Sequence, residues 1–225
     1  MNKETYSLLE AYMLSCMEDS AHDKEHVYRV LYYALEIAKA EESVDYDVLI
    51  GACLLHDIGR KEQLENPALC HAMVGSDKAY HFLTEHGFEA DYAEQVKHCI
   101  QTHRYRKSNP PQSLEAKILF DADKLDAAGA TGIARTLVYK GIVAEPLYSV
   151  LPDGTVSTGA DDRLPSFFQE YKYKLENLYS NFYTVKATEM AKEKQRIAVD
   201  FYECLYQEVN SAYQSGQSEF SRLVR

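Results

Sequence analysis

The feature that most constrains this chain is the helical spacing of its apolar residues. Over 24–41 they recur every three or four positions, at Val27, Val30, Leu31, Ala34, Ile37 and Ala38. This spacing places them on one face of an α-helix, for which Asp23 is a plausible N-cap. The window 46–57 is apolar on most sides, which is typical of a helix buried in a core. It is far shorter than the ~20 apolar residues that cross a membrane.

The same pattern along the rest of the chain predicts an all-α protein, a helical bundle with additional C-terminal helices. Further helices are expected over 70–86, 90–103, 113–127, 129–140, 165–183 and 187–212. One tight hairpin is predicted over 150–156, because Pro152-Asp153-Gly154 is typical turn chemistry. We expect one domain over 1–213, followed by a frayed tail over 214–225. Within the domain we expect a motif-bearing core over 18–140, a long loop over 142–164 and C-terminal helices over 165–213.

Charge and cysteine usage narrow the class of partner and the compartment. With 24 Lys and Arg against 35 Asp and Glu, the net charge is −11, which argues against a nucleic-acid polymer or an anionic membrane as the main partner. The five cysteines include no C-x-x-C pair, a usage typical of reduced thiols inside the cell. The first residues do not resemble a signal peptide. These features predict a cytoplasmic protein and leave a homo-oligomer open.

The dipeptide His56-Asp57 is out of place, because it ends the most hydrophobic of the predicted helices. Burying a histidine and a carboxylate there is unfavourable unless a partner compensates both groups. A divalent metal ion binds neutral imidazole and carboxylate together and is the best such partner. The alternative is a hydrogen-bonded buried histidine beside a C-terminal carboxylate, and the dipeptide alone leaves both open.

Four more residues fall on or beside buried helical faces. His26 lies in the first turn of its predicted helix, and Asp123 lies at the edge of an apolar stripe. His71 opens one predicted helix, and His103 ends another on its inward face. Each of them alone has a plainer explanation, a structural histidine or a solvated acidic face. Their order along the chain is more informative than any one of them.

That order resembles the HD-domain superfamily of metal-dependent phosphohydrolases, whose signature is H…HD…D on a helical bundle. The signature is carried by three segments: HDKEHVYRV (22–30), LLHDIG (54–59) and DADKLD (121–126). The surrounding residues are similar to the bacterial YpgQ/YedJ-type subgroup. This similarity is carried by four segments: His71-Ala72, IQTHR (100–104), LEAKIL (114–119) and GIAR (132–135). The resemblance is close over about 18–140 and loose over the C-terminal helices.

The resemblance implies a divalent metal ion, which the subgroup suggests is manganese, with Mg²⁺, Fe²⁺, Co²⁺ or Ni²⁺ as alternatives. The implied ligands are His26, His56, Asp57 and Asp123. HD proteins with two metals use additional histidines, and two histidines of this chain stand in the right order. These two would either hold a second ion or donate to phosphate beside a single ion, and sequence order leaves both open. The candidate catalytic residues are Asp57, His71 and His103.

The function implied by the resemblance is hydrolysis of a phosphate bond in a small-molecule nucleotide. Members of the subgroup convert nucleoside triphosphates to monophosphate and pyrophosphate through a metal-activated water. One alternative is a nucleotide phosphomonoesterase or phosphodiesterase. Another is an HD-fold regulatory module without turnover, which the complete signature disfavours. An HD-fold di-iron oxygenase would need ligands beyond the four of the signature.

A polyphosphate substrate also needs cations around it. Basic residues near the signature are candidates for substrate binding: Arg60, Lys61, Arg104, Lys124 and Arg135. For Arg60 and Lys61, stabilisation of a helix C-terminus is an equally good reason for the charge. Lys124 has the alternative of a surface lysine. Arg29, one turn after His26, could orient a ligand carboxylate.

Overall fold

The computed structural model describes residues 1–17, 24–104 and 109–224, so the predicted cap Asp23 and the pair His22-Asp23 lie outside the described residues. The chain divides into two compact units. The first comprises Met1–Asp126 with Phe182–Ala187, and the second comprises Ala127–Asn181 with Thr188–Arg225. Each unit is helical, which confirms the predicted all-α class.

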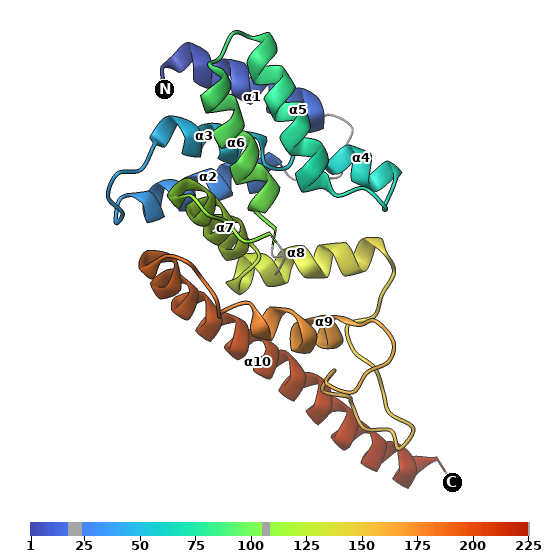
Figure 1. Ribbon diagram of the computed structural model, residues 1–225. Helices are drawn as coiled ribbons and strands as arrows, with labels where there is room; N and C mark the ends of the chain where they lie inside the picture. The colour runs from blue at the N-terminus through green and yellow to red at the C-terminus, as the bar shows by residue number, and fades with distance from the viewer. Residues whose placement is uncertain (18–23, 105–108, 225) are drawn as a thin grey trace. The chain divides into compact units, whose positions relative to one another are not determined.

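The first unit is a helical bundle, coloured from blue to green in Figure 1. Its helices are α1 (Lys3–Met17), α2 (Lys24–Ala38), α3 (Tyr46–Leu55), α4 (Arg60–Glu65), α5 (His71–Glu85), α6 (Ala90–Thr102) and α7 (Leu114–Asp126). α3 packs against α1, α2, α6 and α7, while α5 pairs with α6 and α2 pairs with α7. The first turn of α10 (Val185–Leu223) also belongs to this unit.

α3 is the central helix because its sequence is apolar on every side. Val48, Leu49, Leu54 and Leu55 are all buried, at no more than 1% exposed. The helix begins after Asp45, whose side chain accepts hydrogen bonds from two backbone amides of the first turn. It ends at Leu55, so the polar pair that follows lies in a turn at the edge of the core.

Two glycines bring that turn against α5. A side-chain carbon at Gly59 would lie 2.4 Å from the carbonyl oxygen of His71 and 2.5 Å from the backbone nitrogen of Gly75. Only glycine allows two backbones to approach this closely. The contact places His56 and Asp57, at the end of α3, beside His71 at the start of α5.

The second unit contains α8 (Gly129–Ile142), α9 (Phe167–Tyr173), a 3₁₀ turn (Leu175–Asn177) and the rest of α10. Figure 1 shows α9 lying along α10. Their shared core is largely aromatic, and the rings of Tyr171 and Tyr202 stack with centroids 4.1 Å apart. The predicted hairpin is confirmed as an antiparallel bridge between Val150 and Val156, closed by a turn in which Gly154 has φ +84°.

Most predicted helices are confirmed to within a few residues, and three differences have local causes. The 15-residue helix α1 and the short helix α4, of six residues, were not predicted. The helix predicted over 165–183 begins after the cap Ser166 and stops at Tyr173 as an α-helix. Polar turn-forming residues follow it, and Asn181 adopts φ +63°. α10 continues through most of the tail expected to fray, and its Gln217 donates to the carbonyl of Gly154 at 2.6 Å.

In the ranges 1–17, 24–104 and 109–224, no helix is both long and apolar enough to cross a membrane. The expectation of one domain over 1–213 stays a prediction.

Candidate metal centre

Six predicted site residues come together inside the first unit. They form two groups whose potential ligand atoms lie within 4.8 Å of one another in each group. The first group is His26, His56 and Asp123, and the second is Asp57, His71 and His103. Five of the six side chains are almost fully buried, and the side chain of Asp123 is 25% exposed. Solvent therefore reaches the cluster on the Asp123 side.

Each of the four imidazoles has its Nδ1 atom engaged by a neighbouring acceptor. His56 Nδ1 lies 2.7 Å from the carbonyl oxygen of Cys53, and His103 Nδ1 lies 2.6 Å from that of Ile100. A carbonyl oxygen can only accept, so both Nδ1 atoms carry the proton. In the neutral form, the lone pair of each ring is then on Nε2, which points into the cluster.

The other two histidines use side chains as acceptors. His71 Nδ1 lies 2.6 Å from Gln63 Oε1, and the amide group of Gln63 donates to the carbonyl of Leu69 at 3.0 Å. His26 Nδ1 lies 2.7 Å from Asp126 Oδ2. Fixing one ring nitrogen in this way is how proteins set the tautomer of a metal-binding histidine.

The pair His71 and His103 makes the strongest case for an ion. Their Nε2 atoms lie 3.3 Å apart. Burial lowers the pKa of His71 to about 2 and that of His103 to about 4, so both rings are neutral. Two lone pairs then face each other without a proton between them. Their spacing fits two nitrogen ligands of one ion, each about 2.1 Å from it at an angle near tetrahedral.

The first group differs from the second in the acidic residues around its histidines. His26 Nε2 lies 3.4 Å from His56 Nε2 and 3.3 Å from Asp123 Oδ1. Burial alone would lower the pKa of His26, but its hydrogen bonds to Asp123, Asp126 and Asp57 outweigh burial and raise that pKa well above the usual value. A positive charge is therefore favoured at this place, as expected where a cation binds.

Asp57 lies between the two groups and faces both. Its Oδ2 is 3.5 Å from His26 Nε2 and 3.7 Å from His56 Nε2. Its Oδ1 is 3.4 Å from His71 Nε2 and 3.7 Å from His103 Nε2. One carboxylate could thus contribute an oxygen to each of two ions.

The cluster therefore has the donors that a divalent ion requires, namely neutral imidazole nitrogens and carboxylate oxygens. Burial would raise the pKa of Asp57, but the surrounding imidazoles and Arg60 hold it well below the usual range. The carboxylate stays ionised in a buried place, which again suits a metal ligand.

Arg29 was expected to orient a ligand carboxylate, but it contacts Asp126, which is not one of the predicted ligands. Its Nε donates to Asp126 Oδ1 at 2.6 Å, and its Nη2 donates to Asp126 Oδ2 at 3.2 Å. Asp126 is fully buried and supports His26 from behind.

Asp121 has a different role from its neighbour Asp123. Its carboxylate accepts hydrogen bonds from the backbone amides of Tyr183 and Thr184 and from the Thr184 hydroxyl. Asp121 thus anchors the segment that leads into α10, while Asp123 faces the histidines.

Of the predicted substrate residues, two lie beside the cluster. Arg60 donates from Nε to Asp57 Oδ1 at 2.9 Å. Arg104 points its Nη1 at the sulfur of Cys70, 3.9 Å away, and both arginine charges help to lower the pKa of His71 after burial. Arg60 and Arg104 thus lie on the His71 side of the cluster.

The other three predicted substrate residues are placed differently. Lys124 has its Nζ 4.5 Å from the ring centre of Phe182 and 5.7 Å from that of Phe120. Lys61 lies half-buried on α4, and Arg135 lies on α8 in the second unit. Their role in substrate binding stays a prediction.

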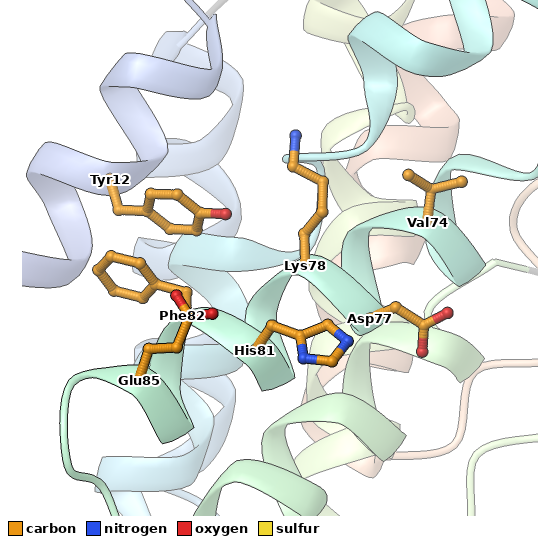
Figure 2. A pocket seen from close by; sticks show the side chains of 7 residues that line it. All are labelled: Tyr12, Val74, Asp77, Lys78, His81, Phe82 and Glu85. Carbon is orange, nitrogen blue, oxygen red and sulfur yellow. The ribbon is translucent and has the colours of Figure 1, made fainter.

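A pocket of about 440 Å³ lies apart from the six ligands, between α1 and α5 (Figure 2). On one side Tyr12 and Phe82 stack with ring centroids 3.7 Å apart. Lys78, which lines it, donates to the carbonyl of Ile58 at 2.8 Å and to Glu62 at 2.6 Å. Lys78 thus ties α5 to the turn after His56-Asp57 and is used structurally.

Sequence reasoning missed Gln63, the acceptor behind His71. It lies on the short polar helix α4, where nothing in the local pattern distinguishes it from a surface glutamine. The roles of the Cys53 and Ile100 carbonyls could not be predicted either, because every residue has a backbone carbonyl.

Comparison with known proteins agrees with this geometry. The HD domain family model matches residues 24–128. The Bacillus subtilis protein YpgQ, described as uncharacterized, is 29% identical over 196 residues, which are 85% of this chain and 86% of YpgQ. Its crystal structure in complex with ADP has a TM-score of 0.69 at 26% identity and covers 89% of this chain and 97% of YpgQ. A crystal structure of an HD-superfamily hydrolase from Bacillus thuringiensis has a TM-score of 0.71 at 28% identity, covering 92% and 98%.

Proposed function

We propose that this chain, whose residues 24–128 match the HD domain family model and whose fold is that of HD-superfamily hydrolases, is a metal-dependent phosphohydrolase of nucleotides. The observation that carries this proposal is the convergence of four imidazole Nε2 atoms on a buried carboxylate, Asp57. Such a set of donors suits a first-row divalent ion, and the resemblance favours Mn²⁺.

We propose two ions. The first would be held by His26, His56, Asp123 and Asp57 Oδ2, and the second by His71, His103 and Asp57 Oδ1. The alternative for the second pair was donation to phosphate. That alternative is disfavoured, because both Nδ1 protons already go to protein acceptors and a neutral ring has no second proton to donate.

When bound, such ions lower the pKa of a coordinated water and neutralise the charge of a phosphate. The chain's own residues supply the rest. Asp57 and Asp123 hold the negative charge that keeps the cations in a buried place. Arg60 and Arg104, beside the second group, would meet the distal phosphates. The exposed edge of Asp123 is the open side, from which substrate would enter.

The substrate class is proposed from the chemistry of the site and from a relative. YpgQ has been crystallised with ADP, so a homologue of similar length binds an adenine nucleotide. For this chain we propose nucleoside or deoxynucleoside triphosphates, cleaved to monophosphate and pyrophosphate. Arg60 and Arg104 would hold the β- and γ-phosphates, which leaves the α-phosphorus for attack.

A nucleotide panel tests the proposal. Protein stripped of metal is reloaded separately with Mn²⁺, Mg²⁺, Co²⁺, Ni²⁺ and Fe²⁺ and incubated with nucleoside mono-, di- and triphosphates and with cyclic nucleotides. We expect metal-dependent turnover that is highest with triphosphates and Mn²⁺. Turnover of monophosphates or cyclic nucleotides alone would assign a different phosphatase activity. Full activity of the protein after its metal has been stripped would contradict a metal-dependent mechanism.

A further inference from the structure

We infer that Asp126 and Gln63 are positioning residues that give the two metal positions unequal affinities, the position of His26 being tighter and that of His71 weaker. This inference rests on the proposed two-ion function. It concerns the side chains that accept a hydrogen bond from Nδ1 of His26 and of His71. These two acceptors differ in charge.

The acceptor behind His26 is a carboxylate. Asp126 Oδ2 lies 2.7 Å from His26 Nδ1, and Asp126 is fully buried. Arg29 donates a hydrogen bond to each oxygen of Asp126, and these two bonds fix the orientation of the carboxylate. A carboxylate behind an imidazole makes its other nitrogen a stronger ligand.

The two helices that meet here share one arrangement. On α2 the ligand His26 and the orienting Arg29 are one turn apart, and on α7 the ligand Asp123 and the supporting Asp126 are also one turn apart. Spacing of three residues puts both members of each pair on the same helical face. Two ligands of the first position, with the residues that orient them, thus lie on facing sides of α2 and α7.

The acceptor behind His71 is neutral. Gln63 Oε1 lies 2.6 Å from His71 Nδ1, and the amide is held in that orientation by the Leu69 carbonyl. Gln63 lies on α4, a helix of six residues with no buried side chain. It orients the ring but adds no negative charge.

The remaining charges increase the difference. The first position has Asp123 and Asp57 Oδ2 as anionic donors, with Asp126 behind them. Among the described residues, Asp57 Oδ1 is the carboxylate oxygen of the second position, and Arg60 already donates to it at 2.9 Å, whereas Arg29 on the first side donates to Asp126 behind His26. Arg104 adds a second positive charge near His71. The first position would therefore hold its ion more tightly than the second.

The test is a titration of metal-free protein with Mn²⁺ alone, followed by calorimetry and by electron paramagnetic resonance of the bound ions. Wild type is expected to bind two ions in two resolved steps. Asp126→Asn keeps an acceptor oxygen but removes the charge, and it should weaken the tighter step by about 10–100-fold. Gln63→Leu should weaken the looser step by a similar factor. Gln63→Glu should tighten that step, and the matched surface change Gln95→Leu should alter neither.

Two results would overturn the inference. One is two equal steps in wild type, and the other is a looser step that is the same in Gln63→Leu, Gln63→Glu and wild type. Circular dichroism on each variant checks that the helices are retained. These results can be separated from the proposed function. If the two ions bind with equal affinity and nucleotides are hydrolysed, the proposed function holds and the inference fails. If the two ions bind with unequal affinities and no nucleotide is hydrolysed, the inference holds and the proposed function fails.

Discussion

The Nε2 atoms of His71 and His103 lie 3.3 Å apart, and in the neutral rings neither of them carries a proton. The Nδ1 protons are taken by Gln63 and by the carbonyl of Ile100. Lone pairs this close repel, and a shared cation removes the repulsion. The relationship supports the proposal that these two buried histidines hold a metal ion.

The first prediction concerns these two histidines. His71→Ala and His103→Ala are each expected to lower the number of bound Mn²⁺ ions from two to one. Turnover should fall by more than about 100-fold, because a bound ion contributes several kcal/mol of charge stabilisation. Elemental analysis of the purified variants measures the ratio. A ratio of zero in either variant would make that histidine a ligand of the first ion instead.

A second prediction concerns Asp57, which faces both positions. Asp57→Asn is expected to weaken both ions, and so to abolish the thermal stabilisation that Mn²⁺ gives to wild type. For a ligand at 100 times its Kd that stabilisation is about 2.7 kcal/mol. The same substitution at Asp77, which is 57% exposed, is the control and should keep the full shift. If Mn²⁺ stabilises the Asp57→Asn variant as much as it stabilises wild type, Asp57 does not contribute to both metal positions.

A third prediction separates two neighbouring acids. Asp121→Asn should destabilise the protein by about 1–3 kcal/mol, because the amide disturbs hydrogen bonds to Tyr183 and Thr184, and it should leave the metal ratio unchanged. Asp123→Asn should do the reverse and weaken the first ion with little loss of stability. Urea unfolding and metal analysis on both variants check this. Loss of metal in Asp121→Asn together with loss of stability in Asp123→Asn would contradict the roles given to the two acids.

The candidate ligands were predicted from a resemblance, because their order along the chain matches the H…HD…D signature. Locally, His56-Asp57 is out of place at the end of an apolar helix. His26, His103 and Asp123 each fit a structural histidine or a solvated acidic face when taken alone. Most of the helices could be predicted from the helical period, since it reflects the burial of one face.

The supporting contacts were not predictable in the same way. Gln63 reaches His71 only because Gly59 and Gly75 let the turn after α3 approach α5. Asp126 reaches His26 across 100 positions of sequence. Such contacts depend on tertiary packing, and neither a Gln on a polar helix nor one of several acids on α7 gives any sign of them.

A fourth prediction tests the close backbone contact. Gly59→Ala should destabilise the protein by about 1–3 kcal/mol and weaken metal binding, because its new side-chain carbon meets the His71 carbonyl and the Gly75 nitrogen. Gly141→Ala is the control, since it lies in α8 with open space around it and should be neutral or slightly stabilising. Equal stability of the two variants, measured by urea unfolding, would contradict the role given to Gly59.

The measurement that tests the central claim most directly is hydrolysis of a deoxynucleoside triphosphate by the Mn²⁺-loaded protein in ¹⁸O-water, with each product analysed by mass spectrometry. Attack of water at the α-phosphorus predicts one ¹⁸O atom in the monophosphate and unlabelled pyrophosphate released intact. Both should disappear when the metal is removed and return when Mn²⁺ is restored. Labelled orthophosphate as the first product, or no metal-dependent cleavage of any nucleotide, would contradict the proposed function.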